Sequence, residues 1–434
     1  MVQKAKFAYA GVALLSWSAA GLASGACSLE GDLKEGRYSD PQKEACAAVE
    51  KARAFGPRDA RLAAALESLG HVEMLLDKYG DAKEHFDQAL VTRWQADQRD
   101  MRAIFRDTTS VGEADQELGL YDDARRKYNE AIAYQEKDPG NPDLGETLND
   151  LGLLEFTLCN YDKARRLYER AKPLIEATYG HSSPMFATIL DNFAKLSQAT
   201  GDPSTAETLL NESLGIRQGV PEPSVHDISV GFSNLATVEA DLGRLDSAEG
   251  LYSKAISLLE HAYPNTPMMT LAVIHINFSV LYRGERKYPQ ARAENAKAAV
   301  ILQNFPEGRQ LAALLNNVAA LASEEGHADL AELHYGFALA MCERVLGPSH
   351  PEVAAVASNL AHFYCAHDQK AKAVPLLKRA MVIYGTRFAP RHLLTQGVAR
   401  ELSTVLRSLG RNGEATEVEL CINRGALCPS FIKP

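Results

Sequence analysis

Residues 232–255, FSNLATVEADLGRLDSAEGLYSKA in one-letter code, decide the fold of this chain. The first half of this stretch carries apolar and small residues at helical spacing: Phe232, Leu235, Ala236 and Val238. Gly243 interrupts that pattern, because glycine at such a position ends helices readily. A second helical stripe follows it: Ala248, Tyr252 and Ala255. The stretch therefore predicts a helix, a tight turn and a second helix.

This pattern returns along the whole chain with a period near 42 residues. Nine alanines equivalent to Ala248 are separated by steps of 42, 40, 42, 42, 43, 40, 42 and 42 residues: Ala82, Ala124, Ala164, Ala206, Ala248, Ala291, Ala331, Ala373 and Ala415. A small residue stands twelve positions before each of them: Gly70, Gly112, Gly152, Ala194, Ala236, Ser279, Ala319, Ala361 and Ser403. Small residues at these two places predict that the paired helices approach closely. Such a repeat has no single core for an active site and works through an extended surface.

Composition agrees with a folded binding protein. Of the 434 residues, 46% are hydrophobic and 24% are charged, which are values of globular chains. The formal net charge of −10 argues against DNA or RNA as the partner, since phosphate binding needs clustered lysine and arginine. The chain shows no glycine-rich phosphate loop, nucleophile elbow or paired-cysteine zinc spacing, so we expect no enzyme activity and no cofactor.

A small residue, an aromatic residue and an alanine at these spacings resemble the tetratricopeptide repeat. The longer period, the Asn-Leu-Ala triplets at 234–236 and 359–361, and the connector Leu346-Gly347-Pro348-Ser349-His350-Pro351 are similar to the repeats of kinesin light chain. The resemblance covers residues from about 59 to 420. It implies an all-α, right-handed superhelical solenoid of stacked antiparallel helix pairs, with about eight full repeats and a degenerate last one.

The two ends of the repeat array depart from its pattern. We predict a signal peptide at 1–26, an N-terminal capping segment at 27–58, the solenoid at 59–410 and a C-terminal cap at 411–434. Ser39-Asp40-Pro41 is a helix-start signal in the first cap, for which a flexible leader is the alternative. In the last repeat, Glu419 and Ile422 replace the usual aromatic residue and alanine, which is typical of a terminal helix with a different outer face.

Residues 1–26 indicate export. Lys4 and Lys6 precede an apolar run at 7–22 and a small-residue stretch at 23–26, which is the order of a signal peptide. The run is shorter than the roughly 20 residues of a membrane span, which disfavours a permanent anchor. Cys27 raises the alternative of an outer-membrane lipoprotein, although Ser24 stands where a lipobox prefers leucine. We expect a periplasmic or secreted protein.

An exported chain can form disulfides, and this one has seven cysteines. Cys421 and Cys428 flank Arg424-Gly425, a helix-stopping turn that can bring the two sulfurs together. Cys27 and Cys46 are a second possible pair unless Cys27 carries lipid. The remaining three lie inside the repeats and are predicted to be buried free thiols: Cys159, Cys342 and Cys365. Cys159 occupies the turn where most repeats carry glycine.

Two positions before each small first-helix residue lies a position that in tetratricopeptide families points into the concave groove. Five consecutive repeats carry asparagine there: Asn192, Asn234, Asn277, Asn317 and Asn359. Earlier repeats carry Ser68, Ser110 and Asp150. An amide can donate to and accept from the main chain of an extended peptide, and the resemblance implies that role for these five ladder asparagines. The alternative is that they bridge neighbouring helices within the array.

One helical turn further along lie the residues expected to confer specificity: Lys195, Thr237, Val280, Ala320 and His362. Asp191, Asp241 and Glu324 add negative charge nearby, which favours a ligand containing lysine or arginine. His362, Cys365 and His367 suggest a metal site, but histidines five residues apart diverge on a helix and no second ligand pair follows, so we predict none.

We therefore expect an exported scaffold that binds a partner protein or peptide segment in its groove. One alternative is a structural or assembly component of an envelope complex, in which a lipid on Cys27 would tether the chain. Another is a peptide-sensing regulator, which the export signal disfavours. The sequence does not name the partner or the oligomeric state.

Overall fold

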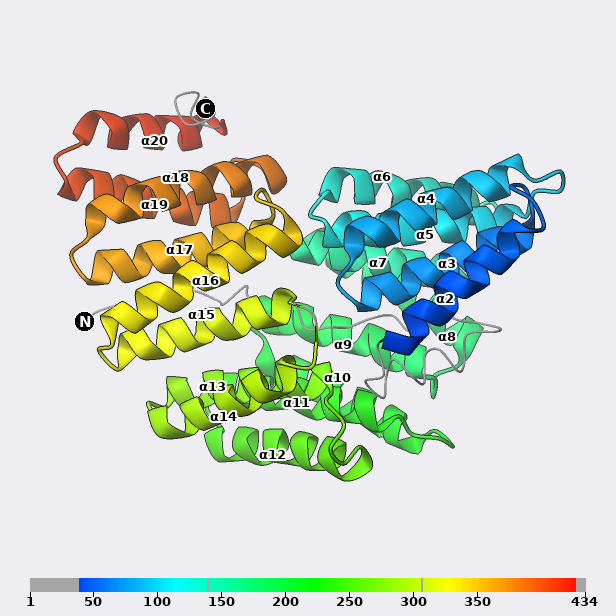
Figure 1. The fold of residues 1–434 in the computed structure, drawn as a ribbon, viewed down its shortest axis with the longest axis horizontal. Coiled ribbons are helices and arrows are strands. Elements are labelled where there is room, and N and C mark those ends of the chain that lie inside the picture. The colour runs from blue at the N-terminus through cyan, green and yellow to red at the C-terminus, as the bar shows by residue number, and fades with distance from the viewer. Residues whose placement is uncertain (1–38, 139, 306, 427–434) are drawn as a thin grey trace. The chain divides into compact units, whose positions relative to one another are not determined.

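The structure, a computed structural model, describes residues 39–138, 140–305 and 307–426 (Figure 1). These residues contain 19 α-helices and no strand, so the predicted all-α fold is confirmed. They form two compact units, which are described separately: the first holds residues up to 287 with 296–305, and the second holds 288–295 with 307–426. The boundary runs through helix α14, Tyr288–Leu302.

The first unit is a series of helix pairs preceded by one single helix. Its helices are α2 Ser39–Arg53, α3 Ala60–Leu75, α4 Tyr79–Gln95, α5 Met101–Glu117, α6 Tyr121–Gln135, α7 Leu144–Thr157, α8 Tyr161–Tyr179, α9 Pro184–Ala199, α10 Pro203–Gly219, α11 Val225–Asp241, α12 Leu245–Ala262 and α13 Met269–Gly284. Each helix packs on the next, and short turns make the two helices of a pair antiparallel. The predicted helix, turn and helix at 232–255 are α11, Gly243 and α12.

The second unit continues the same construction through its own core. Its complete helices are α15 Arg309–Glu324, α16 Ala328–Leu346, α17 Pro351–Ala366, α18 Lys370–Arg387, α19 Leu393–Ser408 and α20 Asn412–Arg424. Buried side chains of these helices form one continuous cluster, in which the ring centroids of Tyr335 and Phe363 lie 5.8 Å apart. None of the described helices in either unit is both long and apolar enough to span a bilayer.

Close packing explains the small residues of the repeat. All nine alanines that define the period have no exposed surface. Their helices also bring an aromatic ring against the small residue of the first helix: a Cβ added to Gly152 would stand 2.5 Å from Cε1 of Tyr168, and one added to Gly70 would stand 2.5 Å from Cε1 of Phe86. The ring of Tyr168 also lies 5.4 Å from that of Phe193 in the next pair, so one aromatic residue joins two pairs.

Replacing Gly152 with alanine is expected to destabilise the first unit by about 1–3 kcal/mol, because the new Cβ overlaps the ring of Tyr168. Gly250→Ala is the matched control, since no atom lies within 4 Å of its would-be Cβ on α12 and alanine favours the helix. Urea unfolding followed by circular dichroism measures both variants. Equal stability of the two would show that the helices can separate at no cost.

The turns inside the pairs repeat with the same register as the alanines. One residue in each turn has positive φ: Asp77, Gly119, Cys159, Gly201, Gly243, Arg286, Gly326, Asp368 and Gly410. This region of backbone space favours glycine. Cys159, with φ of 54°, therefore occupies a strained position in the turn where most other repeats carry glycine.

We expect Cys159→Gly to raise the free energy of unfolding by about 1 kcal/mol, because glycine removes the cost of a side chain at positive φ. Gly243→Ala, at φ of 77°, is the reciprocal change and should lower it by a similar amount. Thermal unfolding of both variants against the parent chain checks the pair. A lower melting temperature for the glycine variant would mean that packing of the Cys159 thiol outweighs the strain.

Both predicted end helices are present in the described residues. Ala45, Val49 and Ala52 of α2 are buried in a cluster with α3, so this helix covers the first pair. In α20, Glu419 accepts hydrogen bonds from Ser403 at 2.5 Å and from Arg407 at 2.7 Å. The polar residue that replaces the aromatic ring is thus paired on α19.

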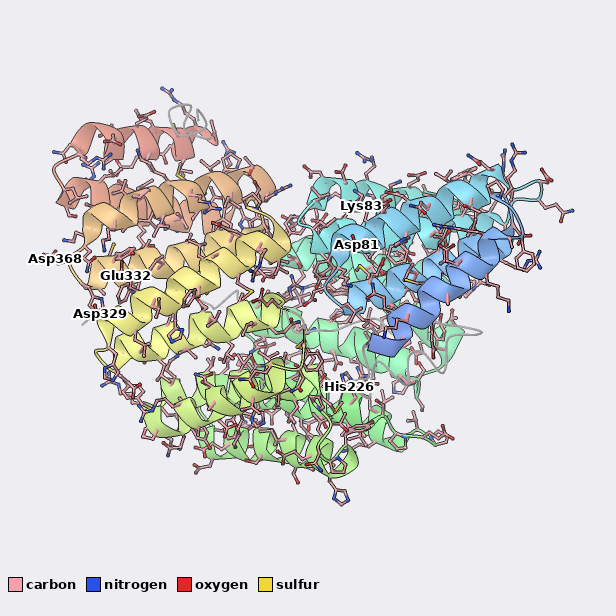
Figure 2. All side chains as sticks on the ribbon, viewed as in Figure 1. Asp81, Lys83, His226, Asp329, Glu332 and Asp368 are labelled. Atoms are coloured by element: carbon pink, nitrogen blue, oxygen red, sulfur yellow. The ribbon has the colours of Figure 1, made fainter. Side chains whose placement is uncertain are left out.

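Ion pairs connect successive helix pairs within a unit, and Figure 2 labels one member of a pair in each unit, Lys83 and Glu332. In the first unit, Lys83 of α4 contacts Asp115 of α5 at 2.5 Å. In the second, Glu332 of α16 contacts Lys372 of α18 at 3.0 Å and also accepts a hydrogen bond from Tyr364. These contacts fix the stacking of one pair on the next.

Candidate functional site

The first helices of successive pairs line one side of each unit. In the first unit α5 contacts α7, α7 contacts α9 and α11 contacts α13. We call the surface formed by the first helices of one unit its inner face. The ladder position lies on these helices, and within each unit its residues are therefore brought into sequence along that face: Ser68, Ser110, Asp150, Asn192, Asn234 and Asn277 in the first unit, and Asn317, Asn359 and Glu401 in the second.

Two ladder asparagines reach back to the preceding pair. Asn192 of α9 donates from Nδ2 to Oδ1 of Asn149 on α7 at 2.8 Å. Asn359 of α17 donates in the same way to Asn316 of α15 at 3.0 Å. In both cases the acceptor is the residue just before the ladder position of the preceding pair. These contacts support the bridging alternative at two positions, one in each unit.

The side-chain amide oxygens of two ladder asparagines lack a hydrogen-bond donor. Oδ1 of Asn192 and Oδ1 of Asn234 are buried and have no hydrogen-bond partner among the described residues. Asn234 and Asn317 are each 7% exposed, whereas Asn277 and Asn359 are half-buried. Burying an amide oxygen without a partner costs free energy, so these positions can gain from a donor brought by a ligand. Their role in peptide binding stays a prediction.

Residues one turn beyond the ladder position lie beside the ladder residue of the next pair. Nδ1 of His362 is 3.7 Å from Oε1 of Glu401, and this carboxylate raises the pKa of His362. In the first unit, Glu113 of α5 and Asp150 of α7 occupy the same two positions of their repeats, and the charge of Glu113 adds to the effect of burial in raising the pKa of Asp150. The ladder residues and the predicted specificity residues therefore meet between pairs, which the spacing within one repeat does not reveal.

Lys195 is half-buried on α9 and its ammonium forms no ion pair with a described residue. Burial lowers the pKa of Lys195 to about 8, although the charge of Asp191 opposes the shift.

Asp191 itself pairs with Arg217 of α10 at 2.6 Å. Asp241 accepts a hydrogen bond from Gln198, also at 2.6 Å. The negative charge predicted at Asp191 is thus neutralised within the fold. Thr237, Val280 and Ala320 occupy the equivalent places on their helices.

Other carboxyls of the first unit form the acidic part of the inner face. We call Glu113 of α5 with Glu146 and Asp150 of α7 the carboxyl cluster. Burial and neighbouring carboxylates raise the pKa of Glu113 to about 8, and burial raises that of Glu146 to about 8. Burial and the charge of Glu113 also raise the pKa of Asp150. The sequence placed Asp150 at the ladder position, but it did not identify Glu113 and Glu146 as site residues.

The histidines that suggested a metal site lie apart. His362 faces Glu401, whereas Nδ1 of His367 contacts the carbonyl oxygen of Phe363 at 2.9 Å and its ring lies tilted against that of Phe363, with centroids 4.4 Å apart. In the described part of the chain, no group of three or more His, Cys, Asp or Glu residues is arranged to hold a metal ion.

The described cysteines are not bonded to one another. Cys342 is buried, Cys159, Cys365 and Cys421 are half-buried, and Cys46 is exposed. Burial raises the pKa of Cys342 to about 12, which keeps it a thiol. Cys27 and Cys428 lie outside the described residues, so both predicted disulfides stay predictions.

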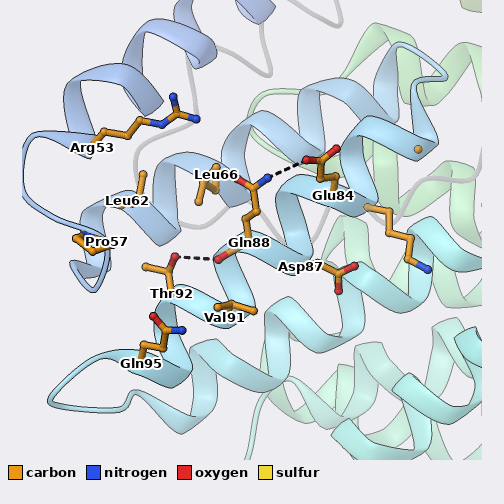
Figure 3. Close-up of a pocket in the computed structure, with 12 residues that line it drawn as sticks. Arg53, Pro57, Leu62, Leu66, Glu84, Asp87, Gln88, Val91, Thr92 and Gln95 are labelled. Atoms are coloured by element: carbon orange, nitrogen blue, oxygen red, sulfur yellow. Dashed lines mark hydrogen bonds between the residues drawn. The ribbon is translucent and has the colours of Figure 1, made fainter.

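A hollow of about 640 Å³ lies over α3 and α4 in the first unit (Figure 3). Leu62, Leu66 and Val91 supply its apolar lining, and Glu84, Asp87 and Gln88 its polar lining. Gln88 donates from its side chain to Glu84 and accepts at its carbonyl from Thr92, so part of the polar lining is already satisfied. None of the ladder residues lines this hollow.

Comparison with known proteins identifies the repeats. A family model described as Tetratricopeptide repeat matches residues 106–171, 143–219 and 310–386, which include parts of both units. The chain is 24% identical over 322 residues to Protein KINESIN LIGHT CHAIN-RELATED 2 of Arabidopsis thaliana, covering 70% of this chain and 47% of that protein. It is 22% identical over 262 residues to Protein KINESIN LIGHT CHAIN-RELATED 3 of the same plant, covering 59% and 39%. The chain thus spans less than half the length of these curated relatives.

Among solved structures, a Rap protein complexed with Competence and Sporulation Factor matches 83% of this chain and 96% of its own, with a TM-score of 0.57 and 12% identity. That likeness confirms the fold and says nothing about activity.

Proposed function

Since this chain is built from tetratricopeptide repeats, we propose that it is a protein-interaction scaffold that binds an extended segment of its partner on an inner face. The observation that carries this proposal is the buried amide oxygen of Asn234, which has no hydrogen-bond partner among the described residues. A main-chain N–H of a bound segment would supply the missing donor. Asn277 lies at the same position on the next first helix, where it can hold the following stretch of main chain.

Photo-crosslinking in cells tests the inner face. A photoreactive residue at Val280 of α13, one turn beyond Asn277, should crosslink to the partner, whereas one at the exposed Ser253 of α12 should not. Combined Asn234→Ala, Asn277→Ala and Asn317→Ala substitutions should remove the crosslink while circular dichroism shows an intact fold. Partner binding that survives the triple substitution at full strength would refute the inner-face mechanism.

We also propose that the scaffold is exported. The support is the order of Lys4, Lys6, the apolar run at 7–22 and the small residues before Cys27, all of which lie outside the described residues. Mass spectrometry of the mature N-terminus tests this: cleavage near Ala26 supports export, and a lipid on Cys27 supports a tethered assembly component of an envelope complex. An uncleaved chain found in the cytoplasm would overturn export.

A second candidate function is a peptide-sensing regulator. The solved Rap protein was captured with Competence and Sporulation Factor, and its fold resembles that of this chain. A sensor differs from a static scaffold because its ligand must change binding at a second site. Equal partner affinity with and without saturating ligand would exclude this candidate.

A further inference from the structure

The carboxyl cluster of the first unit is not neutralised by the fold. No lysine or arginine of the described chain forms an ion pair with Glu113, Glu146 or Asp150. The charge of Arg102 acts on Glu146, but its guanidinium already donates hydrogen bonds from Nε and Nη2 to the carboxylate of Asp143, both at 2.8 Å. Within the described ranges, the hydrogen bond that Glu146 accepts comes from the hydroxyl of Tyr179. Three carboxyls held together in a partly buried place without a cation stay largely protonated near neutral pH, because ionising them would bring like charges together.

Two buried polar groups beside the cluster are unpartnered as well. The hydroxyl of Tyr168 is buried without a hydrogen-bond partner among the described residues, and its side chain crosses α7 against Gly152, two residues from Asp150. Burial raises the pKa of Tyr168, and the charge of Asp150 adds to the shift. On the α9 side, Asn192 is 1% exposed and bonds Asn149, which in turn donates to Asp150 at 3.4 Å. The unpartnered Oδ1 of Asn192 ends this chain of amides.

These groups share one chemical need. Carboxylate oxygens, an amide oxygen and a hydroxyl oxygen are all acceptors, and a single donor group with several N–H bonds can satisfy more than one of them. Glu113 and Glu146 are half-buried, so the cluster remains open to a side chain from outside. An organic cation fits this need, because its N–H groups donate hydrogen bonds and its charge pairs with a carboxylate.

We propose that the carboxyl cluster binds a lysine or arginine side chain of the partner segment, between α5 and α7 on the inner face of the first unit. This inference rests on the proposed function and adds the chemistry of the segment. The main chain of the segment follows the inner face, and its cationic side chain reaches Glu113 and Asp150. Charge complementarity then selects basic segments over neutral ones of the same shape.

Two short peptides test the cation site with the full chain. One is a blocked peptide of alanine and serine with lysine at its centre, and the other has norleucine in place of the lysine, which keeps the length and removes the charge. Isothermal titration calorimetry should show about tenfold tighter binding of the lysine peptide, the effect of one charge-assisted contact. Glu113→Gln with Asp150→Asn should abolish that difference.

The matched control removes two carboxyls far from the cluster. Asp122 and Glu130 are exposed on α6, so Asp122→Asn with Glu130→Gln changes the net charge equally and should keep the preference for lysine. A preference that survives in the cluster variant, or that is lost in the control as well, would overturn the site. So would equal binding of the two peptides by the parent chain, or no binding of either. The crosslinking at Val280 decides separately whether the inner face binds a partner at all.

Discussion

Replacing Arg93 with methionine is expected to lower the free energy of unfolding of the first unit by about 3–5 kcal/mol at pH 8. The guanidinium of Arg93 on α4 contacts Glu67 of α3 at 2.5 Å and Asp107 of α5 at 2.6 Å, and all three residues are buried. Methionine fills most of the volume but leaves the buried carboxylate of Asp107 without its paired cation, while Glu67 keeps its contact with Arg106 at 3.0 Å. This change should be among the most damaging single substitutions in the chain.

The size of this loss should depend on pH. Burial and the nearby charge of Glu67 raise the pKa of Asp107 to about 7, against the opposing effect of Arg93. Below pH 7, a carboxyl left alone can take up a proton and avoid part of the cost, so the loss should be smaller at pH 6 than at pH 8.

The control for Arg93→Met removes the two acids as well. Combined Arg93→Met, Glu67→Gln and Asp107→Asn should recover much of the stability, since no buried charge is then unpaired. Repeat arrays can unfold in parts, so hydrogen exchange of α3 to α5 is the suitable measurement alongside urea unfolding. If the single and the triple variants lose the same free energy, packing at Arg93 matters more than its charge.

The helix pairs could be predicted from the sequence because a single period governs them. Ala248 and its equivalents mark the second helices, and the turn residues follow at the same steps. Asp77, Arg286 and Asp368 were harder to identify, since they occupy a backbone region where glycine is the usual signal. The network of Arg93 was not predicted, because its three residues lie on three helices and its two acids occupy different positions of their repeats.

The candidate site was predicted only in part for a similar reason. The ladder position follows from the register of the repeat, so the sequence identified Asn192 and Asp150. Which residue of one pair faces the ladder residue of the next depends on how the pairs stack, and periodicity does not contain that offset. The meeting of Glu113 with Asp150 therefore appears only in the structure. The same offset places the donor of Asn192 on Asn149.

Glu113→Gln combined with Asp150→Asn is expected to change how stability depends on pH. The folded chain raises the pKa of Glu113 to about 8, from an ordinary value of 4.5. Between these values the folded state holds a proton that the unfolded state has released, so ionisation favours unfolding and stability falls as pH rises. Glu146 acts in the same direction over the same interval. The change levels off above pH 8, as the remaining protons are released from the folded state.

The parent chain should therefore lose about 2 kcal/mol relative to the double variant between pH 5 and pH 8. Other groups with shifted pKa values, such as Asp107 and Lys195, are present in both proteins, so the difference between the two unfolding curves isolates the cluster. A difference that stays constant from pH 5 to pH 8 would mean that Glu113 and Asp150 titrate normally.

A cation bound at the carboxyl cluster would reverse that trend. It stabilises the ionised form of Glu113, so binding must release protons near pH 7, and the affinity of the lysine peptide should rise as pH increases toward 8. Calorimetry in two buffers of different ionisation enthalpy measures the released protons directly. Without a ligand, the free energy cost of ionising neighbouring carboxyls is unrelieved. This cost would be the source of selectivity for basic segments, because only a segment that brings positive charge can remove it.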